Sequence, residues 1–290
     1  MNNMNSNNQE MNNSSKVYAL FYSFFLIPLM LTIFGVLFFF LFKMLTYEKQ
    51  DPYHLLNNIN SGALTKRWQS AYELSNLMSD TNKIPTDPLF ANQLLTLYEK
   101  SIHDDSRIRT YLALAMGQTG NNIFCSKLLE GAQTDKYLEN RIGAIKSIGM
   151  LTCGQSAPYL NELILTKEDN QERLAAIISL GMIKDSSSIS PLTKVLNDEE
   201  ANLRWDAAIA LTKLENKNGY TIIKNLLNRK YYSNFNEVDA NEINNSILTV
   251  LAIVSKFPDQ FFYDELKYLS KYEKNIKIRE FAMKILSEYY

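Results

Sequence analysis

One nine-residue motif recurs along this chain at intervals of about thirty residues. It begins with an arginine, continues with small and apolar residues at helical spacing, and ends with a small residue eight positions later. The four clearest copies are 109–117, 141–149, 173–181 and 204–212, so that the steps between them are 32, 32 and 31 residues. A fixed period of this length is typical of stacked helical repeats, and the chain is expected to fold as one.

Each repeat is predicted to contain two antiparallel helices of roughly 11–14 residues joined by a short turn. Proline recurs 17 or 18 residues after the arginine, at Pro158 and Pro191. Proline suits the first turn of a helix, where its missing N–H would have no partner anyway. The arginine therefore marks the first helix of each unit and the proline the second. We expect the second helices to line the concave face of the stack.

The repeats are predicted to fill residues 64–290, as about six to seven helix pairs in an all-α solenoid. The sixth unit is degenerate, with Asn244 in the place of the arginine, and a last half-unit begins near Arg279. Residues 43–63 read as a juxtamembrane linker and a capping helix, which begins at Asp51 and Pro52. Alanines three or four positions after each arginine should let neighbouring helices approach closely: Ala113, Ala144, Ala176, Ala207, Ala208 and Ala282.

The recurrent arginines are interpreted as a structural ladder. An aspartate lies four to six residues before several of them, and a carboxylate and a guanidinium can pair bidentately and bridge neighbouring units. A row of ligand-binding arginines is the alternative. The ladder is assigned to Arg67, Arg109, Arg141, Arg173, Arg204 and Arg279, with Asp169 and Asp198 as carboxylate partners.

Residues 17–42 contain no charged side chain, and Lys16 and Lys43 bracket them. This segment is predicted to be a transmembrane helix, because an apolar run of this length exceeds that of a signal peptide and no small-residue cleavage site follows. Residues 1–16 are Asn-rich and predicted to be disordered. The basic residues near the two ends favour a cytoplasmic repeat domain, by a small margin that leaves the opposite orientation open. The expected location is a bacterial inner membrane, with a single span.

No motif for catalysis or cofactor binding is found, so the chain is not expected to be an enzyme or to carry a cofactor or metal. The net charge of −1 argues against a dedicated nucleic-acid binder. Two histidines, His54 and His103, cannot supply a zinc ligand set. The two cysteines, Cys125 and Cys153, are expected to be small buried residues without a disulfide between them.

The repeat pattern, Asp-x-x-x-Arg-x-x-Ala with Leu-Gly and Pro-Leu farther on, is clearest over 169–198. It resembles the short bacterial HEAT repeats that also occur in phycobilin lyases. That resemblance implies a right-handed α-solenoid whose concave surface holds a partner, and it carries no catalytic residue across. A related repeat enzyme binds two irons through His-Glu pairs, and this sequence contains no such dipeptide.

Function is expected where the repeat is broken. Residues 231–240 form an insertion that lengthens one step to 40 residues, and such insertions often lie on the binding face. Tyr231, Tyr232 and Phe235 are the candidate partner-binding residues, and an inert loop is the alternative. The tract 224–230 is locally basic. The predicted function is a membrane-anchored scaffold for unidentified protein partners; an accessory subunit of a membrane complex, or a bilin-lyase-like enzyme, are the alternatives.

Overall fold

The computed structural model describes residues 21–45, 51–166 and 169–290, and these fall into two compact units, 1–50 and 51–290. The described residues form helices joined by turns and short irregular segments, without a strand. The predicted disordered tail, 1–16, lies outside the described residues, as do residues 17–20 of the predicted span and 46–50 of the linker.

The first unit contains one long apolar helix. A π-helical turn, Tyr22–Leu26, leads directly into α2, Ile27–Leu45. Almost all of its described side chains are exposed. Among the described residues, Tyr22–Met44 is the helix that is long and apolar enough to cross a membrane.

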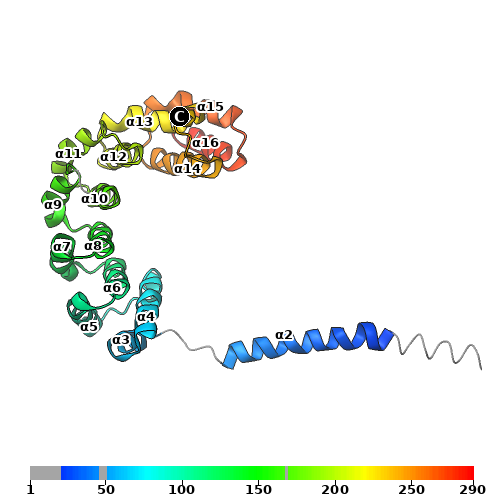
Figure 1. Ribbon diagram of the computed structural model, residues 1–290. Coiled ribbons are helices and arrows are strands. Elements are labelled where there is room, and N and C mark those ends of the chain that lie inside the picture. The colour runs from blue at the N-terminus through cyan, green and yellow to red at the C-terminus, as the bar shows by residue number, and fades with distance from the viewer. Residues whose placement is uncertain (1–20, 46–50, 167–168) are drawn as a thin grey trace, which may run out of the picture. The chain divides into compact units, whose positions relative to one another are not determined.

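The second unit is a two-layered stack of helices that curves into an arc (Figure 1). One layer lies on the outside of the arc and consists of α3 (Pro52–Ser61), α5 (Pro88–Lys100), α7 (Cys125–Thr134), α9 (Ala157–Leu163), α11 (Ile189–Val195), α13 (Tyr220–Leu227) and α15 (Tyr263–Tyr272). Most outer helices follow a short 3-10 turn. Five of the second helices are shorter than the predicted 11–14 residues: α7 and α15 have 10 residues, α13 has 8, and α9 and α11 have 7. The 3-10 segments of the unit are Thr81–Lys83, Ser101–His103, Asn122–Phe124, Gly154–Ser156, Ser186–Ser188, Lys217–Gly219, Arg229–Asn234 and Gln260–Phe262.

The other layer lines the inside of the arc. It consists of α4 (Leu64–Leu77), α6 (Ser106–Gln118), α8 (Leu138–Met150), α10 (Asn170–Ile183), α12 (Ala201–Lys213), α14 (Ala240–Lys256) and α16 (Ile276–Tyr289). These are the first helices of the units, the ones that carry the arginines. The all-α solenoid is confirmed, but the expectation that the second helices line the concave face is wrong.

Close contact between the inner helices explains the direction of the curvature. A Cβ atom on Gly117 would lie 2.8 Å from Cα of Ser147, and one on Gly149 would lie 2.8 Å from Cα of Ser179. Ser147 and Ser179 also donate hydrogen bonds across the units, to the carbonyl oxygens of Ala113 (2.7 Å) and Ile145 (2.8 Å). Small residues therefore bring the inner backbones close together, and the stack bends towards the inner layer.

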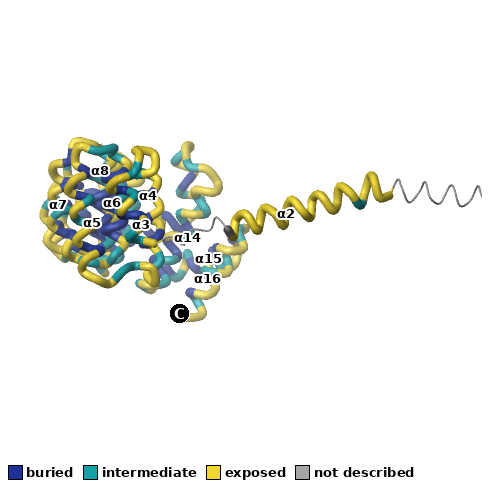
Figure 2. The backbone as a smooth tube through the Cα atoms, turned by 90° about the horizontal axis from the view of Figure 1, so that it is seen from below, coloured by how far each residue is buried: buried dark blue, intermediate teal, exposed yellow. Residues whose placement is uncertain are grey.

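Residues of the buried class lie in the interior of the repeat unit, and exposed residues lie around them (Figure 2). All six predicted close-contact alanines are fully buried, which confirms their packing role. The buried apolar residues form two clusters that meet at α12. The contact between α12 and α14 is much smaller than that between the preceding pairs of inner helices, and the insertion at 231–240 lies between these two helices in the sequence.

A disulfide joins Cys125 to Cys153, which corrects the expectation that the two cysteines stay apart. Cys125 begins α7 and Cys153 precedes the 3-10 turn before α9, so the bond links two consecutive units. Their Cα atoms lie 5.7 Å apart, a normal separation for a disulfide. The 28-residue separation is close to one repeat period and places the two sulfurs at neighbouring positions of the stack.

Candidate functional site: the junction of α12 and α14

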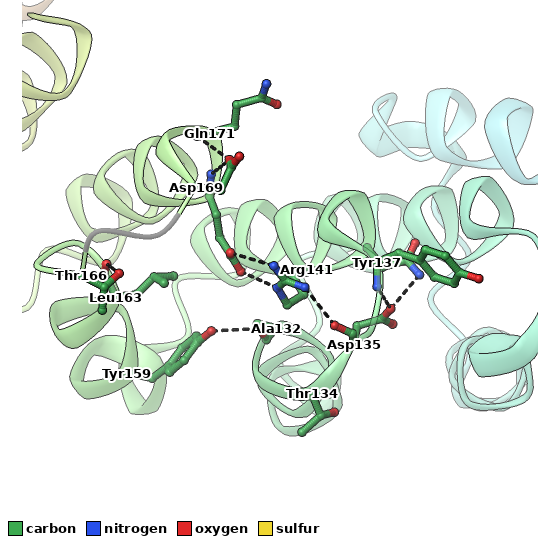
Figure 3. A network of polar contacts seen from close by, with 12 residues as sticks. Ala132, Thr134, Asp135, Tyr137, Arg141, Tyr159, Leu163, Thr166, Asp169 and Gln171 are labelled. Carbon is green, nitrogen blue, oxygen red and sulfur yellow. Dashed lines mark hydrogen bonds and ion pairs between the residues drawn. The ribbon is translucent and has the colours of Figure 1, made fainter. Parts of the chain in front are cut away.

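The repeat arginines lie at the contacts between successive units. Arg141 donates to both carboxylate oxygens of Glu172, at 2.7 and 3.1 Å, and to the backbone oxygen of Asp135 at 3.1 Å (Figure 3). The carboxylate comes from the next unit and the carbonyl from the turn before the arginine's own helix. One guanidinium thus holds two units together.

The same arrangement recurs along the first part of the stack. The arginine–carboxylate pairs are Arg67–Asp104, Arg109–Asp135, Arg141–Glu172 and Arg173–Asp198. Each carboxylate lies shortly before the arginine of its own unit but pairs with the arginine of the preceding unit. Proximity in the sequence alone therefore did not identify the partners. Asp169 forms no such pair; its side chain accepts from the backbone N–H groups of Gln171 and Glu172 and caps α10.

The ladder changes at α12. Arg204 donates to the backbone oxygens of Asp198 and Glu199, at 2.7 and 2.8 Å, and forms no ion pair with a carboxylate in the described chain. Arg279 likewise donates to the backbone oxygen of Glu273. The guanidinium that bridges the last units comes from Arg229, two residues before the insertion.

Arg229 donates to both carboxylate oxygens of Glu273, at 3.2 and 3.0 Å, and to Asn244 at 2.7 Å. Asn244 stands where the repeat expects an arginine, so Arg229 replaces that arginine from another element. Burial alone would raise the pKa of Glu273, but Arg229 and the backbone N–H of Asn275 lower it below its ordinary value. The sequence comparison of repeats could not find Arg229, because it lies outside the periodic position.

The insertion packs an aromatic cluster against Trp205 of α12. The ring centroids of Trp205 and Phe235 lie 5.0 Å apart, and Trp205 donates to the hydroxyl of Tyr231 at 3.3 Å. Tyr231 and Phe235 keep partly exposed rings. Tyr232 is 2 % exposed, and its hydroxyl donates to the backbone oxygen of Leu226. The structure thus places Tyr231 and Phe235 at the surface and Tyr232 in the core, where it fixes the insertion.

Two hollows flank this junction. The first, which we call the acidic hollow, has a volume of about 590 Å³ and lies at the amino ends of α12 and α14. Trp205 and Phe235 form its apolar wall, and Arg204 also lines it. Four carboxylates surround it: Glu199, Glu200, Glu237 and Glu242. Glu242 is engaged with the backbone N–H of Asp239 as part of a capping box.

The second hollow, which we call the basic groove, lies at the carboxyl ends of five consecutive inner helices, α6 to α14, and has a volume of about 540 Å³. Lys184, Lys213 and Lys256 line its α10–α14 end together with Phe257, and Met182 lies beside them. The Lys184 ammonium lies 5.4 Å from the centroid of the Phe257 ring. No carboxylate in the described chain lies within ion-pair distance of these three ammonium groups.

The positive charges of the groove are held close together. Burial lowers the pKa of Lys213; Asp206 on the same helix opposes that shift, and Lys256 and Lys184 add to it. Asp206 is itself desolvated, and burial raises the pKa of its carboxyl to about 6. The carboxyl of Asp206 therefore gives Lys213 only partial compensation.

Comparison with known proteins identifies the repeat type. Residues 157–233 match the family model for HEAT repeats. The structure resembles the complex of CpcE and CpcF of phycocyanin lyase from Nostoc sp. PCC7120, with a TM-score of 0.55 at 18% identity, covering 83% of this chain and 96% of that one. The second unit therefore contains HEAT repeats over residues 157–233 and shares its helical-repeat fold with that complex.

Other solved structures are similar at lower TM-scores. One is YibA of Escherichia coli, with a TM-score of 0.47 at 17% identity over 83% of this chain and 82% of that one. Another is a designed armadillo repeat protein in complex with the peptide (KR)4, with a TM-score of 0.40 at 16% identity over 82% of this chain and 99% of that one. A search of curated proteins finds no match.

Proposed function

We propose that the protein is a membrane-anchored HEAT-repeat scaffold that holds a protein partner on the inner face of its arc. The observation that carries this proposal is the break at α12 and α14, where the insertion separates two inner helices and two charged hollows open on either side. A stack built only for stability would continue its arginine ladder through this point. The partly exposed rings of Tyr231 and Phe235 supply rigid contact area there.

The anchor is proposed from the helix Tyr22–Met44, whose length of 23 residues suits a span of about 30 Å. Deleting residues 1–46 tests its role as a tether. The shortened protein should be monomeric and helical in buffer, and it should no longer be found in the membrane fraction. Aggregation of the shortened chain would show that this helix belongs to the fold.

The partner is proposed to be a protein because the inner face is long and open, as in other α-solenoids that present extended concave surfaces. Affinity purification of the full-length chain after detergent extraction tests this point. Several sub-stoichiometric partners favour a scaffold. One stable partner at fixed stoichiometry favours the alternative, an accessory subunit of a membrane complex.

A lyase-like role is tested by a separate measurement. The purified chain is mixed with a free bilin, and its visible absorption spectrum is recorded. An unchanged spectrum agrees with the scaffold. A shifted spectrum that persists after gel filtration would replace the scaffold by a chromophore-binding function.

A further inference from the structure

We propose that the basic groove binds an acidic polypeptide segment in which carboxylates alternate with apolar side chains. This inference rests on the proposed scaffold function and names the chemistry of its partner. It is carried by the position of Lys184, Lys213 and Lys256 at the α10–α14 end of the groove, beside the exposed thioether of Met182 and the ring of Phe257.

The charge of the groove is uncompensated within the described chain. Three ammonium groups line one end of the groove without an ion-pair partner in the described chain. The carboxyl of Asp206 lies on the same helix as Lys213 and acts on its charge without a hydrogen bond among the described contacts. Lys213 is partly desolvated beside two exposed like charges, so the three ammonium groups repel one another until an anion joins them. A carboxylate that enters the groove would relieve this repulsion.

Lys184 occupies the position that ends α10. Its φ is 60°, in the left-handed region where glycine is favoured. The same conformation recurs at Gly120, Thr152 and Glu215, which are spaced at the repeat period, so it is a feature of the repeat. Glycine fits this backbone better than lysine, and Lys184→Gly therefore removes the ammonium group without straining the chain.

The shape of the groove selects a polypeptide. Its lining residues come from five consecutive inner helices, whose axes are normally 8–10 Å apart, so it extends for on the order of 30 Å. An extended segment of about ten residues has this length. Ile178 and Met182, 37% and 41% exposed, continue an apolar row beside it. A flat bilayer cannot follow the inside of an arc, which argues against lipid headgroups as the ligand.

The test uses the full-length chain in detergent micelles and four fluorescent peptides of about ten residues. One alternates Glu with Leu; in the others Lys or Gln replaces Glu, or Ser replaces Leu. Fluorescence anisotropy should show the Glu-Leu peptide binding at least about tenfold more tightly than each of the others. Equal or tighter binding of the Lys-Leu peptide would overturn the proposal.

Three variants assign the binding to the groove. Lys256→Glu reverses an exposed charge, Lys213→Met keeps the buried stem, and Lys184→Gly relieves the backbone; each should weaken binding about fivefold or more. Lys184→Gly is decisive, because its unfolding midpoint should not fall while its affinity does. Lys194→Glu, on the exposed side of outer helix α11, is the matched control and should change affinity less than about twofold. Unchanged binding in the three groove variants would refute the assignment.

Further outcomes distinguish peptide binding in the groove from lipid binding there and from partner binding elsewhere on the repeat unit. Displacement of the peptide by vesicles of anionic phospholipid, and not by neutral vesicles, would mean that the groove binds lipid and would overturn the proposal. A partner that crosslinks elsewhere on the repeat unit, with no peptide binding in the groove, would leave the scaffold standing and reject only the groove. Absence of any crosslinked partner would reject the scaffold itself.

The disulfide carries a second inference: we infer that the repeat unit lies on the oxidising, extracytoplasmic side of the membrane. Cys125 and Cys153 are 5% and 3% exposed and joined across two units. Structural disulfides persist in secreted and periplasmic proteins, whereas the cytosol keeps thiols reduced. This orientation is opposite to the one favoured by the small excess of basic residues after the apolar helix.

Alkaline phosphatase fused after Tyr290 tests the orientation, since the enzyme is active only outside the cytoplasm. The fusion should be active, and cells quenched with N-ethylmaleimide should yield a Cys125–Cys153-linked peptide by mass spectrometry without reduction. A fusion of the Cys125→Ser variant should remain active, because the disulfide reports the compartment and does not direct insertion. An inactive wild-type fusion, or alkylated free cysteines in quenched cells, would overturn the inference.

Discussion

Replacing Arg109 by alanine tests the arginine ladder at its most buried point. The Arg109 side chain is 7% exposed and pairs with Asp135, whose side chain is 4% exposed. The guanidinium also donates to the backbone oxygen of Tyr98 and lies 4.1 Å from the centroid of the Tyr98 ring. The substitution removes all of these contacts and leaves the Asp135 carboxylate buried with only the N–H donors of Asn140 and Tyr137.

The size of the effect follows from the stranded charge. Removing one partner of a buried ion pair costs about 3–5 kcal/mol, because the remaining charge stays desolvated. Arg204→Ala is the matched control, since Arg204 occupies the same repeat position but donates only to backbone oxygens near the surface. Its loss should cost about 1 kcal/mol. Adding Asp135→Asn to Arg109→Ala should recover about 1–2 kcal/mol by removing the stranded charge.

The assay is urea unfolding of the wild type and the three variants, monitored by far-ultraviolet circular dichroism. The expected order of stability is wild type, Arg204→Ala, the double variant and Arg109→Ala. Equal losses for Arg109→Ala and Arg204→Ala would refute the reasoning, because they would show that the carboxylate partner adds nothing. A double variant less stable than Arg109→Ala would refute the stranded-charge explanation.

Three further predictions concern stability. Burial raises the pKa of Asp206 to about 6 in the folded chain, so stability should fall as pH rises from about 4 to 6, where the unfolded state has already lost this proton. Asp206→Asn should therefore be about 1–2 kcal/mol more stable than wild type at pH 7.5 and no more stable at pH 4, by urea titration at both values. Reduction of the disulfide, which closes a loop of 28 residues, should cost about 3–4 kcal/mol, and reductant should not affect the Cys125→Ser/Cys153→Ser variant. Ala176→Leu, at a fully buried inner-helix position, should cost about 1–3 kcal/mol by overpacking, and an unchanged melting temperature would contradict its stacking role.

The periodic features of the fold could be predicted from the sequence because the residues that determine them lie within each single repeat. Arginine and proline spacing located the two helices of a unit, and the alanines of the inner helices proved to be buried. The concave side could not be found this way. It depends on the difference in spacing between two layers, which arises when Gly149 meets Ser179 across a helix contact.

Features that join different units were predicted less well. The aspartate nearest to an arginine in sequence belongs to the turn before it, yet it faces the arginine of the previous unit, as Asp135 faces Arg109. The disulfide could have been predicted from the spacing of the cysteines. Cys125 and Cys153 are 28 residues apart, which is close to the repeat period and puts them on adjacent units.

The candidate site was predicted in part. The broken period pointed to the insertion. It did not show which rings of the insertion are buried, because the inward position of Tyr232 follows from the 3-10 turn. The basic groove was missed because its lysines belong to different repeats. Lys184 and Lys213 stand at the ends of consecutive inner helices, and alignment of those ends would have brought them together.

Crosslinking from the inner face in intact membranes tests the central claim, that a partner protein binds there. A photoreactive amino acid at Met182, 41% exposed beside the basic groove, is compared with one at Tyr268, 57% exposed on outer helix α15. Discrete protein adducts should form from position 182, disappear in the Lys256→Glu background and be absent from position 268. Adducts from position 268 alone, or adducts from position 182 that Lys256→Glu leaves unchanged, would contradict the claim.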